Sequence, residues 1–539
     1  MRRRVLVASN RGPVSYHFGT DGTLTGRRGG GGMIAGVASG LAGLPPETEV
    51  TWLCAALSDA DRAAAAAVPA AAGTGQDAAG SRAGEAAAAA GTGQDAAAAG
   101  TGQDAGTGPG PAGVPVRMLD IPPEVFDRAY NGVANSTLWF LHHLLFDTPN
   151  QPRFGAEFRR DWQAYLAYNQ AFAEALADEA AGGGREPARR GGARVLVQDY
   201  HLALVPRLLR DRLAGTRPDV RIAHFWHTPW APADYYRLLP GEAGRALLDG
   251  LLGADHLGFH CGRWAAAFLD CCQAVLGAAV TGAERGDRRA VARVAHRGRV
   301  TEVAVHPLGV DAPALRARAR AEDVQQHLGA LRRAAGGRKL IVRVDRTELS
   351  KNIVRGLAAY RELLAARPRW RGRVVHLAFA YPSRSGLPEY RAYTDEVRRA
   401  AREITAEFGT ADWDPLLLEV RDDYPRSLAA CALADVLLVN PIRDGMNLVA
   451  QEGPVLSERG CALVLSAEAG AAATLGDGAL LVNPYDVSET AAALDRALAM
   501  PDEERRRRSA ALAEAAAACA PSRWLGDQLA ALDVAALDA

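Results

Sequence analysis

The sequence lacks the features that mark several large classes of protein. Its 539 residues carry 62 Lys and Arg and 62 Asp and Glu, so the formal net charge is zero and no global field attracts nucleic acid or an anionic membrane. No run of about eighteen apolar residues occurs, which argues against a membrane span. The apolar run in residues 1–12 is too short for a signal peptide. Any anion binding must therefore be local.

Cysteine and histidine are too sparse for a disulfide framework or a recognisable metal site. The seven cysteines include no CxxC pair, and their odd number argues against a disulfide framework, so we expect a reducing, cytosolic compartment. The histidines of residues 199–201 and 224–227 lack the HExxH or similar spacing of zinc ligands, so no metal is predicted. No GxSxG elbow supports a serine hydrolase.

Residues 63–114 do not have the composition of a folded domain. They are almost wholly Ala and Gly, and the hexapeptide GTGQDA recurs at 73–78, 91–96 and 100–105. Such a tract buries little side-chain surface and loses much backbone entropy on ordering. We expect a disordered insertion in a surface loop.

Outside this tract, short apolar runs alternate with amphipathic helical patterns. This alternation is typical of buried parallel sheets, and there are enough runs for two sheets. We predict an α/β protein with two Rossmann-like, doubly wound domains, 1–311 and 312–500, that face each other across a ligand-binding cleft. A helical tail, 501–539, is expected to cross back to the first domain. The runs are 5–9, 194–199, 221–227, 300–307, 339–345, 373–379, 416–420, 436–440 and 462–466.

Residues 436–452, VLLVNPIRDGMNLVAQE, predict a buried strand, a turn and a helix that begins near Met446. Amides at the opening of a helix favour anions, so residues 445–449 could hold a diphosphate or sugar oxygens. Asp444 could then accept hydrogen bonds from sugar hydroxyls, and Glu452 from a ribose. The alternative is that Asp444 caps the helix and Glu452 lies on a solvated face.

A second loop, residues 344–352, follows the first strand of the predicted second domain. Arg346 and Lys351 lie in this loop, and two cations at that place suit a phosphate pair and the charge that develops on it as it departs. The alternative is a surface loop with two ordinary basic residues.

Two segments of the first domain could hold an anion. Residues 9–13, SNRGP, place Arg11 beside a Gly-rich segment, 27–36, whose glycines lack P-loop or Rossmann spacing but allow close approach of a ligand. Tyr130 and Trp139 are polar-tipped aromatics that suit a sugar phosphate, although packing in the core is the commoner role.

Two further segments, 197–204 and 224–232, follow apolar strands of the first domain. Asp199 and His201 could bind hydroxyl groups or act as bases, and His227 could donate a hydrogen bond to a developing charge. The alternative is that these histidines are buried and satisfied within the core.

Taken in order, these segments resemble trehalose-6-phosphate synthases, which are retaining glycosyltransferases of the two-domain GT-B architecture. The resemblance runs from about residue 5 to about residue 500 and omits the Ala- and Gly-rich insertion. Its most specific element is RDGMNLVAQE, residues 443–452. The other elements are SNRGP, GGGGMIAG, YNGVANSTLW, QDYH, HFWHTPWAP, HLGFHC, RTELSK, YPSRSGLPEY, ALVLSAEAGAA and LLVNPYD.

The resemblance implies transfer of glucose from a nucleoside diphosphate glucose to the anomeric hydroxyl of glucose 6-phosphate, without a cofactor or a required metal. It also implies that the departing diphosphate oxygen, rather than a protein base, takes the acceptor proton. The implied acceptor residues are Arg11, Tyr130, Trp139, Asp199 and Arg384. The implied donor residues are Gly32, His227, Arg346, Lys351, Asp444, Asn447, Leu448, Val449 and Glu452, of which His227, Arg346, Lys351 and Asp444 are the catalytic set.

The sequence departs from the family pattern at a few positions. Gln198 stands where a histidine is common, RTELSK replaces RLDYSK, Gln451 replaces a lysine, and Glu468 replaces an apolar aromatic. These changes leave the donor base open between UDP and GDP. A pseudo-glycosyltransferase that joins cyclitols, a glucosylglycerol-phosphate synthase and a silent regulatory subunit of a trehalose complex are the rival hypotheses. The sequence leaves homo-oligomerisation open.

Overall fold

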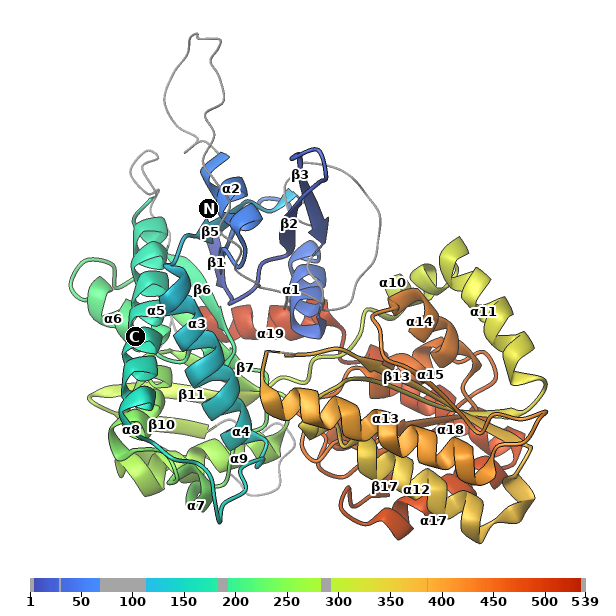
Figure 1. Ribbon diagram of the computed structural model, residues 1–539. Helices are drawn as coiled ribbons and strands as arrows, with labels where there is room; N and C mark the ends of the chain where they lie inside the picture. The colour runs from blue at the N-terminus through green and yellow to red at the C-terminus, as the bar shows by residue number, and fades with distance from the viewer. Residues whose placement is uncertain are drawn as a thin grey trace.

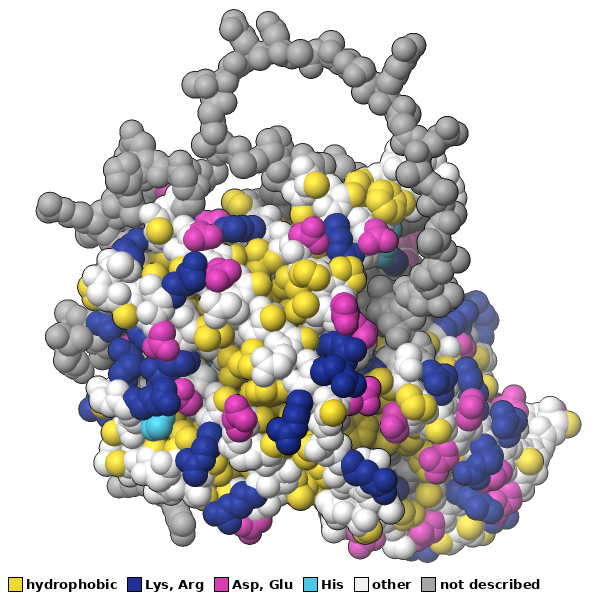
Figure 2. All heavy atoms as spheres, turned by 60° about the vertical axis from the view of Figure 1, so that its left-hand side comes forward, with side chains coloured by type: hydrophobic (Ala, Val, Ile, Leu, Met, Phe, Trp, Pro, Cys, Tyr) yellow, Lys and Arg dark blue, Asp and Glu magenta, His cyan; other side chains and the backbone are white. Residues whose placement is uncertain are grey.

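The computed structural model shows two α/β bodies joined side by side (Figure 1). The structure describes residues 4–28, 31–67, 113–182, 192–282, 292–384 and 386–534. The predicted α/β class with two parallel-sheet domains is confirmed. On the face drawn in Figure 2, basic and acidic side chains are interspersed around apolar ones, as the zero net charge leads one to expect.

The N-terminal body is built on a sheet in which nine described strands follow the order β5-β4-β1-β6-β7-β8-β11-β10-β9. Strand β1 (Arg4–Ala8) lies in the interior of the sheet, between and parallel to β4 (Glu49–Ala55) and β6 (Ala193–Gln198). Only the pairs that involve β10 with β9 and β11 are antiparallel. The other strands are β5 (Val116–Leu119), β7 (Arg221–Trp226), β8 (His256–Phe259), β9 (Ala279–Thr281), β10 (Ala292–His296) and β11 (Arg299–Val305).

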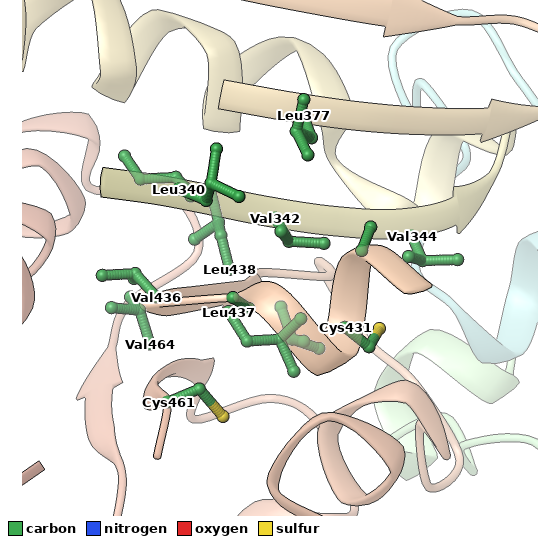
Figure 3. Close-up of a cluster of buried hydrophobic side chains, with 14 of the residues drawn as sticks. Leu340, Val342, Val344, Leu377, Cys431, Val436, Leu437, Leu438, Cys461 and Val464 are labelled. Carbon is green, nitrogen blue, oxygen red and sulfur yellow. The ribbon is translucent and has the colours of Figure 1, made fainter. Parts of the chain in front are cut away.

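The C-terminal body contains a parallel sheet of six described strands in the order β14-β13-β12-β15-β16-β17. Side chains of β12 (Lys339–Arg346) and β15 (Val436–Val439) meet in its core (Figure 3). Both faces of these strands are covered, which explains why β15 is apolar at every position. The remaining strands are β13 (Val374–Tyr381), β14 (Leu416–Glu419), β16 (Ala462–Ser466) and β17 (Leu480–Val482).

The helices of the N-terminal body flank its sheet, and a hairpin of β2 (Val14–Phe18) and β3 (Leu24–Arg28) stands beside them. The helices are α1 (Gly32–Ala42), α2 (Asp59–Ala67), α3 (Pro123–Asp127), the π-helix η2 (Arg128–Leu138), α4 (Trp139–His142), α5 (Ala156–Ala181), η3 (Tyr200–Leu202), α6 (Val205–Leu213), α7 (Ala233–Tyr236), α8 (Gly241–Leu251), α9 (Gly262–Cys271) and η4 (Cys272–Leu276).

The segment 63–114, predicted to be disordered, falls mostly outside the described residues. Its first part, 63–67, is instead the end of helix α2, so the prediction of disorder is wrong for these residues. The physical reason lies in the helix itself. Alanine has the highest helix propensity, Asp59 and Asp61 lie in the first turn of α2, and Ala64 is buried against the body.

The helices of the C-terminal body carry the periodicity that the sequence led us to expect. In α12 (Ile353–Ala366), the side chains of Ile353, Leu357, Tyr360 and Leu364 recur at helical spacing and are buried. The others are α10 (Ala312–Ala319), α11 (Glu322–Ala335), η5 (Leu349–Lys351), η6 (Pro368–Trp370), α13 (Pro388–Phe408), α14 (Tyr424–Leu433), α15 (Val449–Leu456), α16 (Ala472–Leu475) and α17 (Val487–Ala499).

The chain returns to the N-terminal body at its last described helix. Helix α18 (Asp502–Ala517) packs against α15, and α19 (Pro521–Val534) packs against α1, β7 and β8 (Figure 1). The ring of Trp524 lies 5.0 Å from that of Phe225. At the crossing, the Gly309 amide donates to the Cys519 carbonyl at 2.6 Å, so both connections between the bodies run side by side.

Candidate active site

The loop after β15 docks onto the N-terminal body, and Gly445 is its contact point. A Cβ atom on Gly445 would lie 1.7 Å from the carbonyl oxygen of His227, so no other residue fits there without moving the two bodies apart. Trp264 Nε1 donates to the Gly445 carbonyl at 3.0 Å. The loop that carries Asp444 is therefore held between the two bodies.

Asp444 and Lys351 form an ion pair at the junction between the two bodies, which we call the seam. Lys351 Nζ donates to Asp444 Oδ2 at 2.5 Å, and Asn447 Nδ2 donates to the same oxygen at 3.1 Å. Burial works against both charges, but Lys351 holds the pKa of Asp444 below its usual value, and Asp444 with Asp345 holds the pKa of Lys351 above its own. Both groups are therefore ionised at neutral pH.

Helix α15 begins at Val449, later than predicted, because Asn447 takes a left-handed conformation with φ of 75°. Asn447 Oδ1 accepts from the Ala450 amide at 3.2 Å, so Asn447 is the capping side chain. The alternative interpretation of Asp444 as the helix cap is wrong, because its carboxylate is bound to Lys351. The Gln451 and Glu452 amides donate to the Leu448 carbonyl, so the amides that can donate to a ligand are those that precede Ala450.

Glu452 lies one turn into α15 and is partly buried. Burial raises the pKa of its carboxyl group to about 7. The alternative of a fully solvated helix face does not fit this partial burial.

The residues before α15 touch the start of α1. A Cβ atom on Gly32 would lie 2.5 Å from Leu448 Cδ1, so the first residue of α1 closes over the loop of residues 447–449. Leu448 and Val449 are only partly buried and border the same place. The structure thus brings together Gly32 and the opening of α15 from opposite bodies.

Arg346 and Arg384 of the C-terminal body face Trp139 of the N-terminal body. The guanidinium carbons lie 5.9 Å and 4.1 Å from the centre of the Trp139 ring, within cation–π range. Arg384 has a φ of 47°, a strained value for a residue with a side chain. The cations expected at the donor and at the acceptor therefore share one indole ring.

Arg11 lies on the N-terminal side of the same group. Arg11 Nη2 donates to the hydroxyl oxygen of Tyr130 at 3.3 Å, and Tyr130 stacks on His201 with ring centres 5.5 Å apart. Burial raises the pKa of Tyr130, but Arg11 and Arg384 outweigh it and hold the pKa below its ordinary value. This is a locally positive place, although the chain as a whole is neutral.

Asp199 and His227 follow neighbouring strands, β6 and β7. Asp199 Oδ1 accepts from the His227 amide at 3.3 Å, and its burial raises the pKa of the carboxyl group to about 7. His227 Nε2 lies 2.9 Å from Gln198 Oε1, which leaves Nδ1 for another partner. Burial, followed by His260 and His224, holds the pKa of His227 well below its usual value, so the imidazole is neutral.

A family model described as glycosyltransferase family 20 matches residues 112–533. The chain belongs to glycosyltransferase family 20. It is 35% identical over 384 residues to a probable alpha,alpha-trehalose-phosphate synthase [UDP-forming] 2 of Arabidopsis thaliana, and the match covers 71% of this chain but only 44% of that relative.

The solved structures of similar proteins cover the chain more fully. A UDP-forming alpha,alpha-trehalose-phosphate synthase of Burkholderia xenovorans in complex with glucose-6-phosphate superimposes with a TM-score of 0.74 at 27% identity, over 98% of this chain and all (100%) of that one. An E. coli structure described as trehalose-6-phosphate bound with UDP-2-fluoro glucose gives 0.75 at 25% identity, over 98% of both chains. The GT-B architecture is confirmed.

Three further residues of this family 20 chain also lie at the site, although the sequence motifs assigned them no role. Glu348 lies fully buried between Arg346 and Arg384, and Trp264 clamps Gly445. His143 stacks on Trp139 with ring centres 3.9 Å apart, and burial lowers its pKa to about 3. Glu348 stands inside the RTELSK motif, so its position could have suggested a role. Nothing in the sequence points to the other two.

Among the described residues, no helix is long and apolar enough to cross a membrane. No group of three or more His, Cys, Asp or Glu side chains in that same part of the family 20 chain is arranged to hold a metal ion.

Proposed function

We propose that this protein transfers glucose from a nucleoside diphosphate glucose to the anomeric hydroxyl of glucose 6-phosphate, with retention of configuration, to give α,α-trehalose 6-phosphate. One observation carries the proposal: two groups of cations meet where the two bodies join, with Arg11 contributed by the N-terminal body and the other three side chains by the C-terminal body. Lys351 and Arg346 form the donor group, and Arg11 and Arg384 form the acceptor group. Two separate phosphorylated substrates explain two such groups.

On the donor side, Lys351 and Arg346 bind the diphosphate together with the amides of Asn447, Leu448 and Val449. Asp444 accepts hydrogen bonds from glucose hydroxyls while its other contacts, Lys351 and Asn447, keep it in place. Glu452 accepts hydrogen bonds from the ribose, one turn along the same helix. Gly32 closes over the bound sugar nucleotide, and His227 contacts its glucose.

On the acceptor side, Arg11, Arg384, Tyr130 and Trp139 hold the phosphate of glucose 6-phosphate. Guanidinium groups suit a phosphate because they donate in pairs. Asp199 binds hydroxyl groups of the acceptor sugar beside His227.

The chemical step breaks the bond from the anomeric carbon of the donor glucose to the diphosphate oxygen. It forms a bond from the same carbon, on the same face, to the acceptor's anomeric oxygen. The proton of that hydroxyl passes to the departing diphosphate oxygen, so atoms and charge balance without a protein base. The protein's part is to orient both sugars and to stabilise charge on the diphosphate with Lys351, Arg346 and the opening of α15.

The donor is a nucleoside diphosphate glucose, and we propose UDP-glucose over GDP-glucose. The support is indirect: the Arabidopsis and Burkholderia relatives are described as UDP-forming. A reducing, cytosolic compartment stays a prediction, homo-oligomerisation stays open, and none of the seven cysteines, all of which lie among the described residues, forms a disulfide.

The test is to incubate the protein with glucose 6-phosphate and UDP-glucose or GDP-glucose, follow nucleotide release, and identify the product by NMR. We expect a non-reducing, α,α-linked disaccharide phosphate and release of the nucleotide only when glucose 6-phosphate is present. Glycerol 3-phosphate replaces the acceptor in a parallel reaction. Faster release with glycerol 3-phosphate, or no glycosidic product with either donor, would disprove the proposal.

A further inference from the structure

Glu348 is the most completely buried charged side chain of the seam, with no exposed surface. Its Oε1 atom lies 2.9 Å from Arg346 Nη1 and 3.6 Å from Arg384 Nη1, and it accepts from Ser383 Oγ at 2.9 Å. A single carboxylate oxygen therefore serves both arginines.

The two arginines belong to different substrates under the proposed function. Arg346 serves the donor diphosphate and Arg384 the acceptor phosphate, yet both also lie over Trp139. Because Glu348 and Trp139 each touch both side chains, the position of one arginine is fixed relative to the other. A displacement of one arginine therefore alters the surroundings of the other through the shared carboxylate.

Hydrogen bonding alone does not explain why a carboxylate occupies this place. Glu348 Oε2 is shielded from solvent and has no hydrogen-bond partner among the residues that the structure describes. Burial of a carboxylate is unfavourable unless opposite charges compensate it. Burial would raise the pKa of Glu348, but Arg346 and Arg384 hold it at about 2, so the group stays ionised.

We propose that Glu348 is a positioning residue, which aims Arg346 at the donor diphosphate and Arg384 at the acceptor phosphate and so joins the two anion sites into one unit. This inference rests on the proposed function. Glu348 touches neither substrate. Its negative charge competes weakly with both anions for the arginines. Its contacts also keep the two arginine side chains in the orientation that the reaction needs.

The test is Glu348→Gln, which keeps the shape and removes the charge. We expect kcat to fall at least about tenfold, because each arginine loses the partner that orients it. We expect calorimetric affinities for UDP and for inorganic phosphate to stay the same or to tighten, because a competing negative charge has gone. A residue needed only for packing would weaken binding and turnover together. Weaker binding of both probes, or a kcat within about twofold of the unsubstituted protein, would overturn the proposal.

Two further variants serve as controls. Glu348→Asp keeps the charge and should restore kcat to within about threefold. Asp255→Asn removes another buried carboxylate, which pairs with Arg210 and Arg299 far along the N-terminal sheet. We expect it to lower the melting temperature and to leave the affinities for UDP and phosphate unchanged. Loss of activity in Glu348→Asp equal to that of the amide variant would also overturn the proposal.

If Glu348→Gln fails to fold, Ser383→Ala tests the same positioning role with a smaller perturbation, because it removes one hydrogen-bond donor to Glu348 Oε1. We then expect kcat about threefold lower with no loss of affinity for UDP or phosphate, and an unchanged kcat would overturn the proposal. The binding arms need no turnover. If the unsubstituted protein makes no disaccharide phosphate, the proposed function fails while the role of Glu348 in anion binding is still measured.

Discussion

Glu452 offers the sharpest test of the donor site, because its ionisation and its proposed ligand are linked. Burial raises the pKa of the free carboxyl group to about 7. Ribose hydroxyls donate to the ionised form, so binding of a sugar nucleotide must remove the proton where one is present. The affinity therefore falls as the pH drops below 7. From pH 8 to pH 6 the ionised fraction falls about tenfold, and the dissociation constant should rise about tenfold.

The measurement is calorimetric titration with UDP-glucose, without acceptor, at pH 6, 7 and 8. UDP-glucose is preferable to UDP, whose terminal phosphate titrates in the same range. At pH 7, buffers of different ionisation enthalpy should reveal release of about half a proton per nucleotide, the free fraction protonated at the pKa. Glu452→Gln should bind more weakly at pH 8 by about ten- to a hundredfold, the worth of hydrogen bonds to a charged group.

The variant also separates Glu452 from Asp199, whose pKa is likewise about 7. In Glu452→Gln the pH dependence of UDP-glucose binding should disappear, because Asp199 serves the acceptor. A carboxyl group with a raised pKa lowers stability above its unfolded pKa, so the variant should also melt at a higher temperature at pH 8. A variant that keeps the full pH dependence, or binds as tightly as the unsubstituted protein at pH 8, would refute the ribose assignment.

The other predictions concern the cations and the seam. Lys351→Ala should lower kcat by orders of magnitude with the fold intact, measured by nucleotide release and circular dichroism; near-normal turnover would defeat the assignment. Arg11→Met should raise KM for glucose 6-phosphate about tenfold or more and leave UDP-glucose affinity unchanged, and equal effects on both would contradict the division of the site. Gly445→Ala should lower kcat at least about tenfold and stability by about 1–3 kcal/mol, because its Cβ would meet the His227 carbonyl at 1.7 Å. Gly526→Ala in helix α19, which has open space around it, is the control and should leave kcat unchanged while raising stability by about 0.5–1 kcal/mol.

The arrangement of strands could be predicted from the sequence because buried parallel strands carry continuous apolar runs. Strand Val436–Val439 illustrates this. All of its side chains are buried, so its sequence is continuously apolar and shows no alternation of apolar and polar residues. The start of α15 was predicted too early. A helical pattern does not reveal that Asn447 adopts positive φ and delays the helix to Val449. The helical end of α2 was missed because composition alone does not show that Ala64 packs against the body.

The site could be predicted where short motifs carry its functional residues, but not where it depends on packing between distant segments. Arg346 and Lys351 stand five residues apart in one loop, so their joint role could be expected. The contact of Trp264 with Gly445 links residues 181 positions apart, and no local pattern encodes it. Glu348 is an intermediate case. It stands in the RTELSK motif, but Arg384, the second arginine that it contacts, lies in the loop after another strand.

Charge compensation explains how a neutral chain can bind two phosphorylated substrates. Every cation of the site already has a partner: Lys351 has Asp444, Arg346 and Arg384 share Glu348, and Arg11 has the Tyr130 hydroxyl. Substrate binding is therefore an exchange of partners: three cations held by two ionised carboxylates, and Arg11 held by a hydroxyl group, turn to two more highly charged ligands. Because the carboxylates stay in place, the cations keep their geometry when the ligands leave. The same arrangement explains why each carboxylate matters to a reaction in which it takes no proton.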